Sequence, residues 1–391
     1  MCQENSVSDS PLLAPMQLSP LHAEHESLGA SFTGFAGWQM PVRYSSDLTE
    51  HAAVRTAAGL FDLSHMAEIA VSGPDAGAFL DYALAGRLST LPLLKAKYSL
   101  LLDTDGGIID DLIVYASAEA EYLVVANASN RTAVVEALID RQADFDIQLV
   151  DLTDHTALIA VQGPAAREIL EATPGLTLRD DLSRGRTLDS LGYYAAMGMA
   201  WAEGAVFVAR TGYTGEDGFE LYVDNADAAT LWRAILAAGE PHGLVPCGLA
   251  ARDTLRLEAG MPLYGHELSR DILPVQAGLG RVVAVDKPRF VGQSAIEAGP
   301  AEGARVLVGL RTEGRRAPRA EYAVFAAASR GDESEVGAIT SGALSPTLGY
   351  PIAMALVHPD HRAPGTVLEV DVRGTRVPAT VVTLPFYRKE A

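Results

Sequence analysis

Cysteine is scarce in this chain, and basic residues are missing from its first part. Only Cys2 and Cys247 occur in 391 residues, too few for a disulfide framework or a cysteine metal site. Two free thiols suit a reducing compartment, so a cytoplasmic location is expected. Residues 1–42 contain no Lys or Arg, which argues against a secretory signal or a transit peptide. No apolar run approaches the roughly 18 residues of a membrane-spanning helix, so no membrane association is expected.

Positive charge is in short supply over the whole chain. The 30 Lys and Arg residues face 50 Asp and Glu residues, which gives a formal net charge of −20. Binding to nucleic acid or anionic membranes needs a surplus of basic groups facing phosphates, so neither partner is expected. A hydrophobic content of 48% and a mean hydropathy of +0.12 are typical of a globular protein with a sizeable core. The length allows two or three domains of roughly 100–200 residues each.

Common cofactor and metal motifs are absent as well. Gly212, Gly215 and Gly218 lie in a hairpin loop and lack the spacing of a dinucleotide fingerprint, which also needs a strand before it and a helix after it. The chain contains no Walker A sequence, no His-Glu-x-x-His and no Cys-x-x-Cys. We therefore expect neither a nucleotide cofactor nor a metal ion.

Turn residues and hydrophobic periodicity predict an α+β region that follows an irregular start. Residues 1–18 are expected to form a flexible tail. A helix is expected over 72–95, and a hairpin around 104–107, where glycines supply the positive φ of a tight turn. Further strands are expected at 97–103, 108–116, 121–126, 156–162 and within the hairpin 205–223, and helices at 47–58, 131–142, 165–172, 227–238 and 249–259.

The character of the sequence changes after about residue 290. Short β-like runs alternate there with Gly and Pro at nearly regular spacing, which indicates an antiparallel sandwich or barrel. These runs are 306–310, 322–326, 336–340, 352–357, 367–372 and 379–382.

Two adjacent carboxylates, Asp110 and Asp111, interrupt one of the most apolar predicted strands. Asp is depleted in strands, and an ionised carboxylate taken out of water is costly unless hydrogen bonds or an opposite charge compensate it. Alternation puts the two side chains on opposite faces, but it does not say which face is covered. A structural acid at a strand edge and a functional site both remain open on this stretch alone.

Other polar positions have a default structural interpretation. Glu220 projects to the face of its strand opposite Phe219, where it is either solvated or lines a cavity. Arg252 and Asp253, near the start of a helix, read by default as a surface ion pair.

The remaining candidates lie next to strand ends and near the N-terminus. Tyr98 starts a strand and Asn127 ends one, so each could simply satisfy backbone groups. His65 is interpreted first as a structural histidine rather than as a ligand or base. The pair His22 and His25 is interpreted as solvated surface.

A set of ordered segments carries a family resemblance. With these segments the chain resembles the aminomethyltransferase of the glycine cleavage system, the T protein, over nearly all of residues 19–391. The segments are Gly34-Phe-Ala-Gly-Trp-Gln-Met-Pro41, Phe61-Asp-Leu-Ser-His-Met66, the stretch 106–114, Arg210-Thr-Gly-Tyr-Thr-Gly-Glu-Asp-Gly-Phe-Glu220, and the stretches 248–260, 263–265 and 339–349.

The resemblance implies an α+β fold of three domains around a central channel. The first domain, which binds folate, would be discontinuous and consist of residues 19–69 and 154–270. The second would be a ferredoxin-like α+β domain over 70–153 that carries the catalytic Asp. The third would be a C-terminal antiparallel β-barrel or sandwich, with its linker, over 271–391.

The resemblance also implies an activity and its partners. A lipoylated carrier protein would deliver an aminomethyl group to tetrahydrofolate. The products would be 5,10-methylenetetrahydrofolate, ammonia and the dihydrolipoyl carrier. The enzyme is expected to be a monomer that meets both the carrier and the folate.

The matched positions supply a candidate site. Asp111 matches the catalytic Asp of the family, Glu220 a carboxylate that binds the pterin, Arg252 a folate-site arginine, and Tyr387 a tyrosine near the folate. Asp110 is left with a structural or solvent-facing role. The folate-binding set implied by the resemblance is Met66, Tyr98, Asp111, Ile113, Val125, Asn127, Glu220, Arg252 and Tyr387.

Departures from the family pattern keep two alternatives open. Residues 31–34 lack the acid that usually precedes the Phe-Ala-Gly-Trp segment, and His266 stands where a glutamine is common. One alternative is a tetrahydrofolate-dependent demethylase of a small methylated compound. The other is a non-catalytic folate-binding protein of the same fold, although residues 288–293 lack the cysteine of that branch's signature.

Overall fold

A five-stranded antiparallel sheet carries the two adjacent carboxylates. The computed structural model describes residues 16–327 and 334–389. The strand order is β6-β7-β8-β5-β9, and the turn predicted between β6 and β7 is confirmed, with Gly106 at a φ of 80°. The strands are β5 (Ala67–Ser72), β6 (Ala96–Leu102), β7 (Ile108–Ala118), β8 (Glu121–Ala126) and β9 (Gln148–Asp151).

A seven-stranded sheet faces the first one. It is built from chain segments on both sides of the five-stranded sheet, in the order β11-β12-β13-β14-β10-β4-β15. Only the β4–β15 pair at one edge is parallel. The strands are β4 (Ala58–Asp62), β10 (Thr156–Gln162), β11 (Leu176–Thr177), β12 (Ala196–Trp201), β13 (Gly204–Ala209), β14 (Gly218–Asp224) and β15 (Leu244–Pro246).

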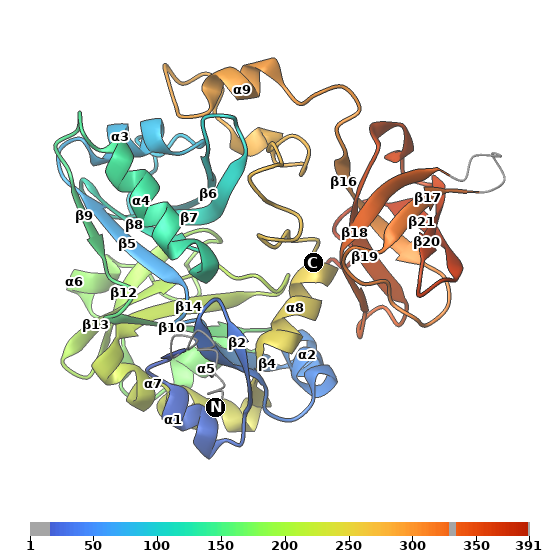
Figure 1. The fold of residues 1–391 in the computed structure, drawn as a ribbon. Helices are drawn as coiled ribbons and strands as arrows, with labels where there is room; N and C mark the ends of the chain where they lie inside the picture. The colour runs from blue at the N-terminus through green and yellow to red at the C-terminus, as the bar shows by residue number, and fades with distance from the viewer. Residues whose placement is uncertain (1–15, 328–333, 390–391) are drawn as a thin grey trace, which may run out of the picture.

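Helices cover the outer face of each sheet, so this part of the molecule has four layers (Figure 1). Helices α3 (Ala76–Ala83) and α4 (Arg131–Arg141) pack on the five-stranded sheet through one apolar cluster. Helices α5 (Ala166–Ala172) and α7 (Asn225–Gly239) pack on the seven-stranded sheet through another. A third cluster, which includes Phe61, Tyr115 and Tyr222, lies between the sheets.

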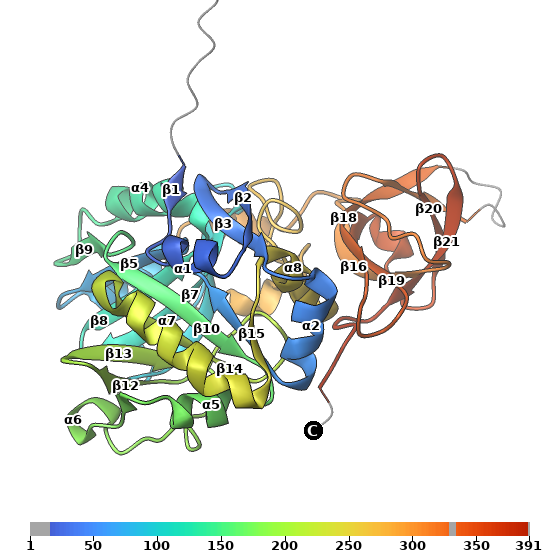
Figure 2. The same cartoon turned by 90° about the horizontal axis from the view of Figure 1, so that it is seen from below.

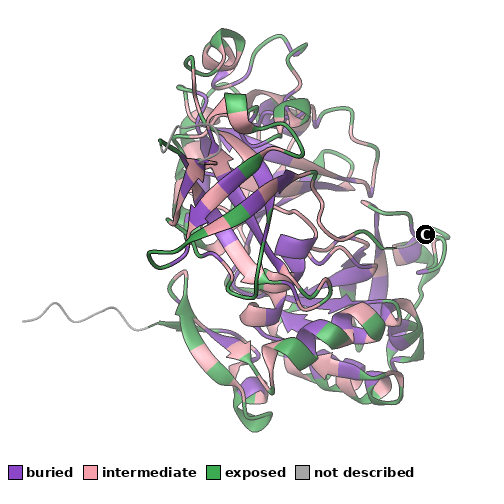
Figure 3. Ribbon diagram, turned by 90° about the vertical axis from the view of Figure 1, so that its right-hand side faces the viewer, coloured by how far each residue is buried: buried purple, intermediate pink, exposed green. Residues whose placement is uncertain are grey.

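The C-terminal part forms a closed six-stranded barrel beside these layers. Its strand order is β16-β19-β18-β17-β20-β21, and buried residues alternate with exposed ones along the strands that face the viewer in Figure 3. The predicted α+β fold class with a C-terminal antiparallel β domain is confirmed, and closure makes that domain a barrel. The strands are β16 (Val306–Thr312), β17 (Ala323–Ala326), β18 (Glu335–Leu344), β19 (Pro351–Val357), β20 (Val367–Asp371) and β21 (Arg376–Val382).

Two helices lie between the sheets and the barrel. Helices α2 (Asp47–Thr56) and α8 (Leu249–Glu258) run side by side there (Figure 2). The short α9 (Gln293–Ala298) belongs to the connection that leads to the barrel, and α6 (Asp180–Ser183) lies against β12. None of the described helices combines the length and apolarity needed to cross a membrane. The domain boundaries given above remain predictions.

The N-terminal segment is held in place by a buried histidine. Helix α1 (His22–Ser27) places His25 at 0% exposure, where its Nε2 lies 2.7 Å from Asp62 and its Nδ1 lies 2.9 Å from the hydroxyl of Tyr44. The expectation of a solvated histidine was therefore wrong at His25, because its partners are distant in sequence. The three-stranded sheet next to it contains β1 (Gln17–Leu18), β2 (Ser31–Phe35) and β3 (Trp38–Arg43).

The structure differs from two expectations in the first quarter of the chain. The pair Gln17 and Leu18, counted in the tail, forms a parallel strand with β3, whereas residues 1–15 lie outside the described residues. The helix expected over 72–95 extends only over Ala76–Ala83. The carboxylate of Asp81 accepts the backbone N–H groups of Leu88 and Ser89, which turns the chain away from a helical path.

Candidate active site between the two sheets

The structure shows which of the two adjacent carboxylates faces the second sheet. Asp111 shares its face of β7 with Ile113 and Tyr115, which belong to the cluster between the sheets. Asp110 lies on the opposite face and is 0% exposed, so the solvent-facing alternative for it was wrong. Asp111 itself is half-buried. Only Asp111 therefore points into the space between the two sheets.

Asn127, directly after β8, links the two carboxylates. Its Nδ2 amide lies 2.8 Å from Oδ1 of Asp110 and 2.8 Å from Oδ1 of Asp111. Its backbone N–H donates to Oδ2 of Asp110 at 2.9 Å, and Asn130 Nδ2 donates to Oδ1 of the same carboxylate at 2.6 Å. The predicted site residue Asn127 thus sets the orientation of Asp111 and anchors it to the buried Asp110.

A row of predicted residues forms the surface beside Asp111. Strand register aligns Tyr98, Ile113 and Val125 across β6, β7 and β8. The hydroxyl of Tyr98 donates to Oδ2 of Asp111 at 3.0 Å. Met66 immediately precedes β5, whose first residue pairs with the last residue of β8, so Met66 lies near Asn127. Ile113, Val125 and Met66 give this surface an apolar character suited to a flat heterocycle.

Burial is the main cause of the pKa shifts of Asp110 and Asp111, and no described cation pairs with either carboxylate. Burial raises the pKa of Asp111, and the hydrogen bonds from Tyr98 and Asn127 oppose that shift. Burial and the charge of Asp111 raise the pKa of Asp110. Among the described residues neither carboxylate forms an ion pair. A nearby group that gains positive charge would therefore be attracted strongly.

Glu220 of β14 lies on the opposite sheet and is not solvated. It is 8% exposed, and its Oε2 accepts the hydroxyl of Thr211 and, at 3.5 Å, that of Tyr115. The Tyr115 hydroxyl also lies 2.9 Å from the Thr211 hydroxyl, so β7 and β14 are joined across the space between the sheets. Burial raises the pKa of Glu220, against the hydrogen bond of Thr211 and the charge of Arg252. The default interpretation of a solvated Glu220 was wrong.

Arg252 of α8 supplies positive charge beside Glu220. Its guanidinium lies 4.7 Å from the ring centroid of Tyr213, and its charge lowers the pKa of Glu220. Asp253 pairs instead with Arg256, at 2.7 Å, so the expected ion pair with Arg252 was wrong. Residues three apart face each other on a helix, whereas adjacent ones do not. Arg252 is left without a carboxylate partner among the described residues.

His65 and Glu68 flank the site as buried groups with unmet hydrogen-bonding capacity. Burial, followed by the charge of Arg252, lowers the pKa of His65 to about 4, so its ring is neutral near pH 7. Within the described part of the chain, its Nδ1 and both carboxyl oxygens of Glu68 lack a hydrogen-bond partner. Burial raises the pKa of Glu68 well above its ordinary value.

Sequence reasoning missed Tyr115, Thr211 and Tyr213 as parts of this region. Tyr115 shares the strand face of Asp111, and this alternation was the available signal. Thr211 and Tyr213 lie in the loop between β13 and β14, where no periodicity marks them. The predicted residue Tyr387 makes its contacts elsewhere: its hydroxyl donates to Glu216 at 2.8 Å.

Comparisons with known proteins agree with this architecture. The family model of the GCVT N-terminal domain matches residues 21–287, and that of the glycine cleavage T-protein C-terminal barrel domain matches residues 305–388. These matches cover the two sheets and the barrel. They define the class of the protein as a tetrahydrofolate-dependent group transferase.

Curated relatives narrow the class to one family. An aminomethyltransferase of Saccharopolyspora erythraea is 54% identical over 377 residues, covering 95% of this chain and 98% of the relative. One of Cutibacterium acnes is 56% identical over 381 residues, covering 96% and 100%. The crystal structure of the glycine cleavage system aminomethyltransferase T from Bartonella henselae superimposes with a TM-score of 0.85 at 36% identity, covering 95% of this chain and 98% of that one. The chain belongs to the aminomethyltransferase family of the glycine cleavage system, as its sequence predicted.

Proposed function

We propose that this enzyme transfers an aminomethyl group from a dihydrolipoyl carrier protein to tetrahydrofolate through the site around Asp111. The observation that carries the proposal is the pairing of two carboxylates on facing sheets, one half-buried (Asp111) and one buried (Glu220). Asp111 lies in one sheet with neutral donors, and Glu220 lies in the other with Arg252 nearby. One carboxylate can bind the folate while the other faces the reacting carbon.

Glu220 suits the pterin of tetrahydrofolate. A pterin presents adjacent N–H donors, which match the two oxygens of a carboxylate. Thr211 and Tyr115 occupy Oε2 of Glu220, and no described residue donates to Oε1. Arg252, Ile113 and Val125 would border the same ligand. These features support a folate site at this place.

Asp111 suits the chemistry at the aminomethyl carbon. Two folate nitrogens replace the sulfur and the amine on this carbon, so two C–N bonds form while one C–S and one C–N bond break. The two protons lost from the folate nitrogens end on ammonia and on the carrier thiol. The charge of Asp111 would stabilise the cation that develops on the way, and its carboxylate would hold or pass a proton.

One assay tests the proposal against its alternatives. The purified protein is mixed with tetrahydrofolate and an aminomethyl-loaded lipoyl carrier, and ammonia and methylenetetrahydrofolate are both measured. We expect equal amounts of the two products. Activity with small methylated donors but none with the carrier would instead indicate a demethylase, and folate binding without turnover would indicate a binding protein. The monomeric state, the cytoplasmic location and the lack of a metal or nucleotide stay predictions.

A further inference from the structure

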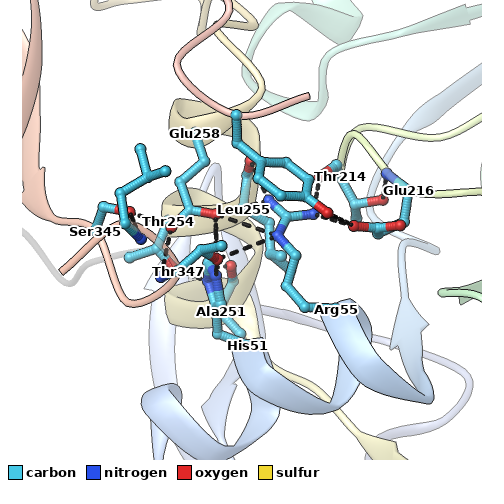
Figure 4. Close-up of polar contacts among 12 residues, drawn as sticks. His51, Arg55, Thr214, Glu216, Ala251, Thr254, Leu255, Glu258, Ser345 and Thr347 are labelled. Atoms are coloured by element: carbon cyan, nitrogen blue, oxygen red, sulfur yellow. Dashed lines mark hydrogen bonds and ion pairs between the residues drawn. The ribbon is translucent and has the colours of Figure 1, made fainter. Parts of the chain in front are cut away.

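A buried polar cluster lies where α2, α8, the barrel and the C-terminal segment meet (Figure 4). Arg55 of α2 is at its centre, with a side chain only 6% exposed. We define the Arg55 cluster as Arg55 together with His51, Glu216, Glu258 and Tyr387. None of these residues contacts Asp111 or Glu220 through a hydrogen bond.

Arg55 uses its whole guanidinium in this cluster. Its Nε and Nη2 donate to Oε2 of Glu258 at 3.2 and 2.8 Å. Its Nη1 donates to the carbonyl oxygen of Thr214 at 2.8 Å and to Oε1 of Glu216 at 3.1 Å. The ring of Tyr387 covers it, with 4.1 Å from guanidinium carbon to ring centroid. A planar fork can make these contacts together, whereas a lysine ammonium cannot.

The elements that Arg55 joins are those that carry predicted folate residues. Glu258 lies on α8, the helix of Arg252. Thr214 and Glu216 lie in the β13–β14 loop, whose Tyr213 stacks on Arg252. Tyr387 belongs to the C-terminal segment, and its backbone N–H also donates to the carbonyl oxygen of Glu258, at 2.8 Å.

Glu258 extends the cluster to the barrel. It accepts hydrogen bonds from the hydroxyl of Ser345, from the hydroxyl of Thr347 at 2.7 Å and from the backbone N–H of Thr347 at 3.0 Å. Its Oε2 also lies 3.1 Å from Nε2 of His51. The carboxylate of Glu258 and the guanidinium of Arg55 thus contact α8, the β13–β14 loop, the C-terminal segment and the barrel together.

We propose that Arg55 is a positioning residue of the folate site, acting through Glu216 on the β13–β14 loop and through Glu258 on α8. The proposal rests on the function proposed above, because it assigns the folate to the space bordered by Arg252 and Glu220. Arg55 sets the distance between the loop that carries Tyr213 and the helix that carries Arg252. A displacement of about 1 Å there is enough to weaken binding of a rigid ligand.

The test compares Arg55→Lys and Glu216→Gln with a matched control. Arg131→Lys is the control, since Arg131 also uses its fork to join separate segments, at 2.7 Å to Asp151 and 2.8 Å to Asp154, in the five-stranded sheet region. Steady-state kinetics are measured with tetrahydrofolate and with the loaded carrier varied in turn. Thermal unfolding of each variant reports its stability.

We expect Arg55→Lys to raise the KM for tetrahydrofolate about 10-fold, with kcat and the KM for the carrier nearly unchanged. Glu216→Gln keeps the bond between Arg55 and Glu258, and should raise the same KM about 3-fold. The double variant should resemble Arg55→Lys alone, because both changes act on one contact. Arg131→Lys should lower stability without changing the KM for tetrahydrofolate.

Two results would overturn the proposal. One is a wild-type KM for tetrahydrofolate in both Arg55→Lys and Glu216→Gln; if Arg55→Lys does not fold, the Glu216→Gln result alone decides. The other is an equal rise in Arg131→Lys, which would indicate a general loss of stability. A wild-type enzyme that neither binds nor uses tetrahydrofolate would refute the proposed function instead, so the two failures are distinguishable.

Discussion

The carboxylates at the Asp110–Asp111 pair and at Glu258 are compensated in different ways for their removal from water. Asp110 and Asp111 receive hydrogen bonds from neutral amides and a phenol, and burial raises the pKa of both. Burial acts in the same direction on Glu258, but His51 and Arg55, together with neighbouring hydroxyls, lower its pKa to about 2. The two sites therefore differ mainly in whether a cation is present.

This difference separates a site that can react from one that holds elements together. A carboxylate beside cations stays charged at any physiological pH and serves as a fixed anchor. A carboxylate among neutral donors keeps a higher proton affinity and an uncompensated charge, which a substrate that becomes positive can use. Asp111 is therefore a better candidate for catalysis than Glu258.

The largest expected effect comes from Asp111→Asn. We expect product formation to fall roughly 100- to 1,000-fold, because the amide carries no charge to stabilise a developing cation. The fold should persist, since an amide fills the same space. Methylenetetrahydrofolate formation, with thermal unfolding as a check, measures this.

Asp110→Asn is the matched control for that change. Asp110 accepts only N–H donors, from Asn127 and Asn130, so a new amide there brings donors together and should cost about 1–3 kcal/mol of stability. Its activity should fall much less than that of Asp111→Asn. Equal losses of activity in the two variants would contradict the assignment of Asp111.

The second prediction concerns Glu258, the carboxylate that anchors the Arg55 cluster. Glu258→Gln should lower the free energy of unfolding by about 3 kcal/mol, since it removes one of the two carboxylates that compensate the buried charge of Arg55. The exposed pair of Arg305 and Glu335 is the control, and Glu335→Gln should cost at most about 0.5 kcal/mol. Chemical denaturation measures both. A similar small cost at Glu258 would mean that the cluster does not behave as a buried ionic anchor.

Local patterns were sufficient for most of the fold. The turn 104–107, the strand at 156–162 and the barrel runs all rest on signals within a few residues, namely glycines, alternation and turn spacing. The barrel, rather than a sandwich, required knowing that β16 pairs with both β19 and β21, and such long-range pairing leaves no local mark.

The candidate site shows where local patterns end. Alternation separated the faces of Asp110 and Asp111 but could not say that one face meets a second sheet. The pair of His25 and Asp62 is 37 residues apart, and Arg55 and Glu258 are 203 apart, so neither contact follows from a nearby motif. Family resemblance, not periodicity, pointed to Asp111 and Glu220.

The third prediction uses pH to separate the two sites. The pKa of Glu258 is lower in the folded state, about 2 against 4.5, so its contribution to stability is present above pH 4.5 and lost as the pH falls towards 2. The raised pKa values of Asp110 and Asp111 act in reverse: stability is present below their ordinary 3.8 and lost as the pH rises through the folded values.

The loss of unfolding free energy in Glu258→Gln and that in Asp110→Asn should therefore depend on pH in opposite directions. Relative to the wild type, Glu258→Gln should lose more stability at pH 7 than at pH 3. Asp110→Asn should lose more at pH 5 than at pH 8, because burial favours the protonated carboxyl group of the wild type and that contribution is lost as the pH rises. Unfolding free energies at these values decide the matter, and parallel pH dependences would refute the contrast.

The smallest effect is expected at Tyr98, whose hydroxyl donates to Asp111 at 3.0 Å. Tyr98→Phe removes one hydrogen bond of about 1 kcal/mol, so activity should fall about 5-fold. The same bond lowers the pKa of Asp111, so its loss should move the acidic limb of the kcat/KM profile to higher pH. Tyr122→Phe, in the apolar cluster on the other face of the sheet, should leave that limb in place. An unshifted limb in Tyr98→Phe would mean that the group titrating in catalysis is not Asp111.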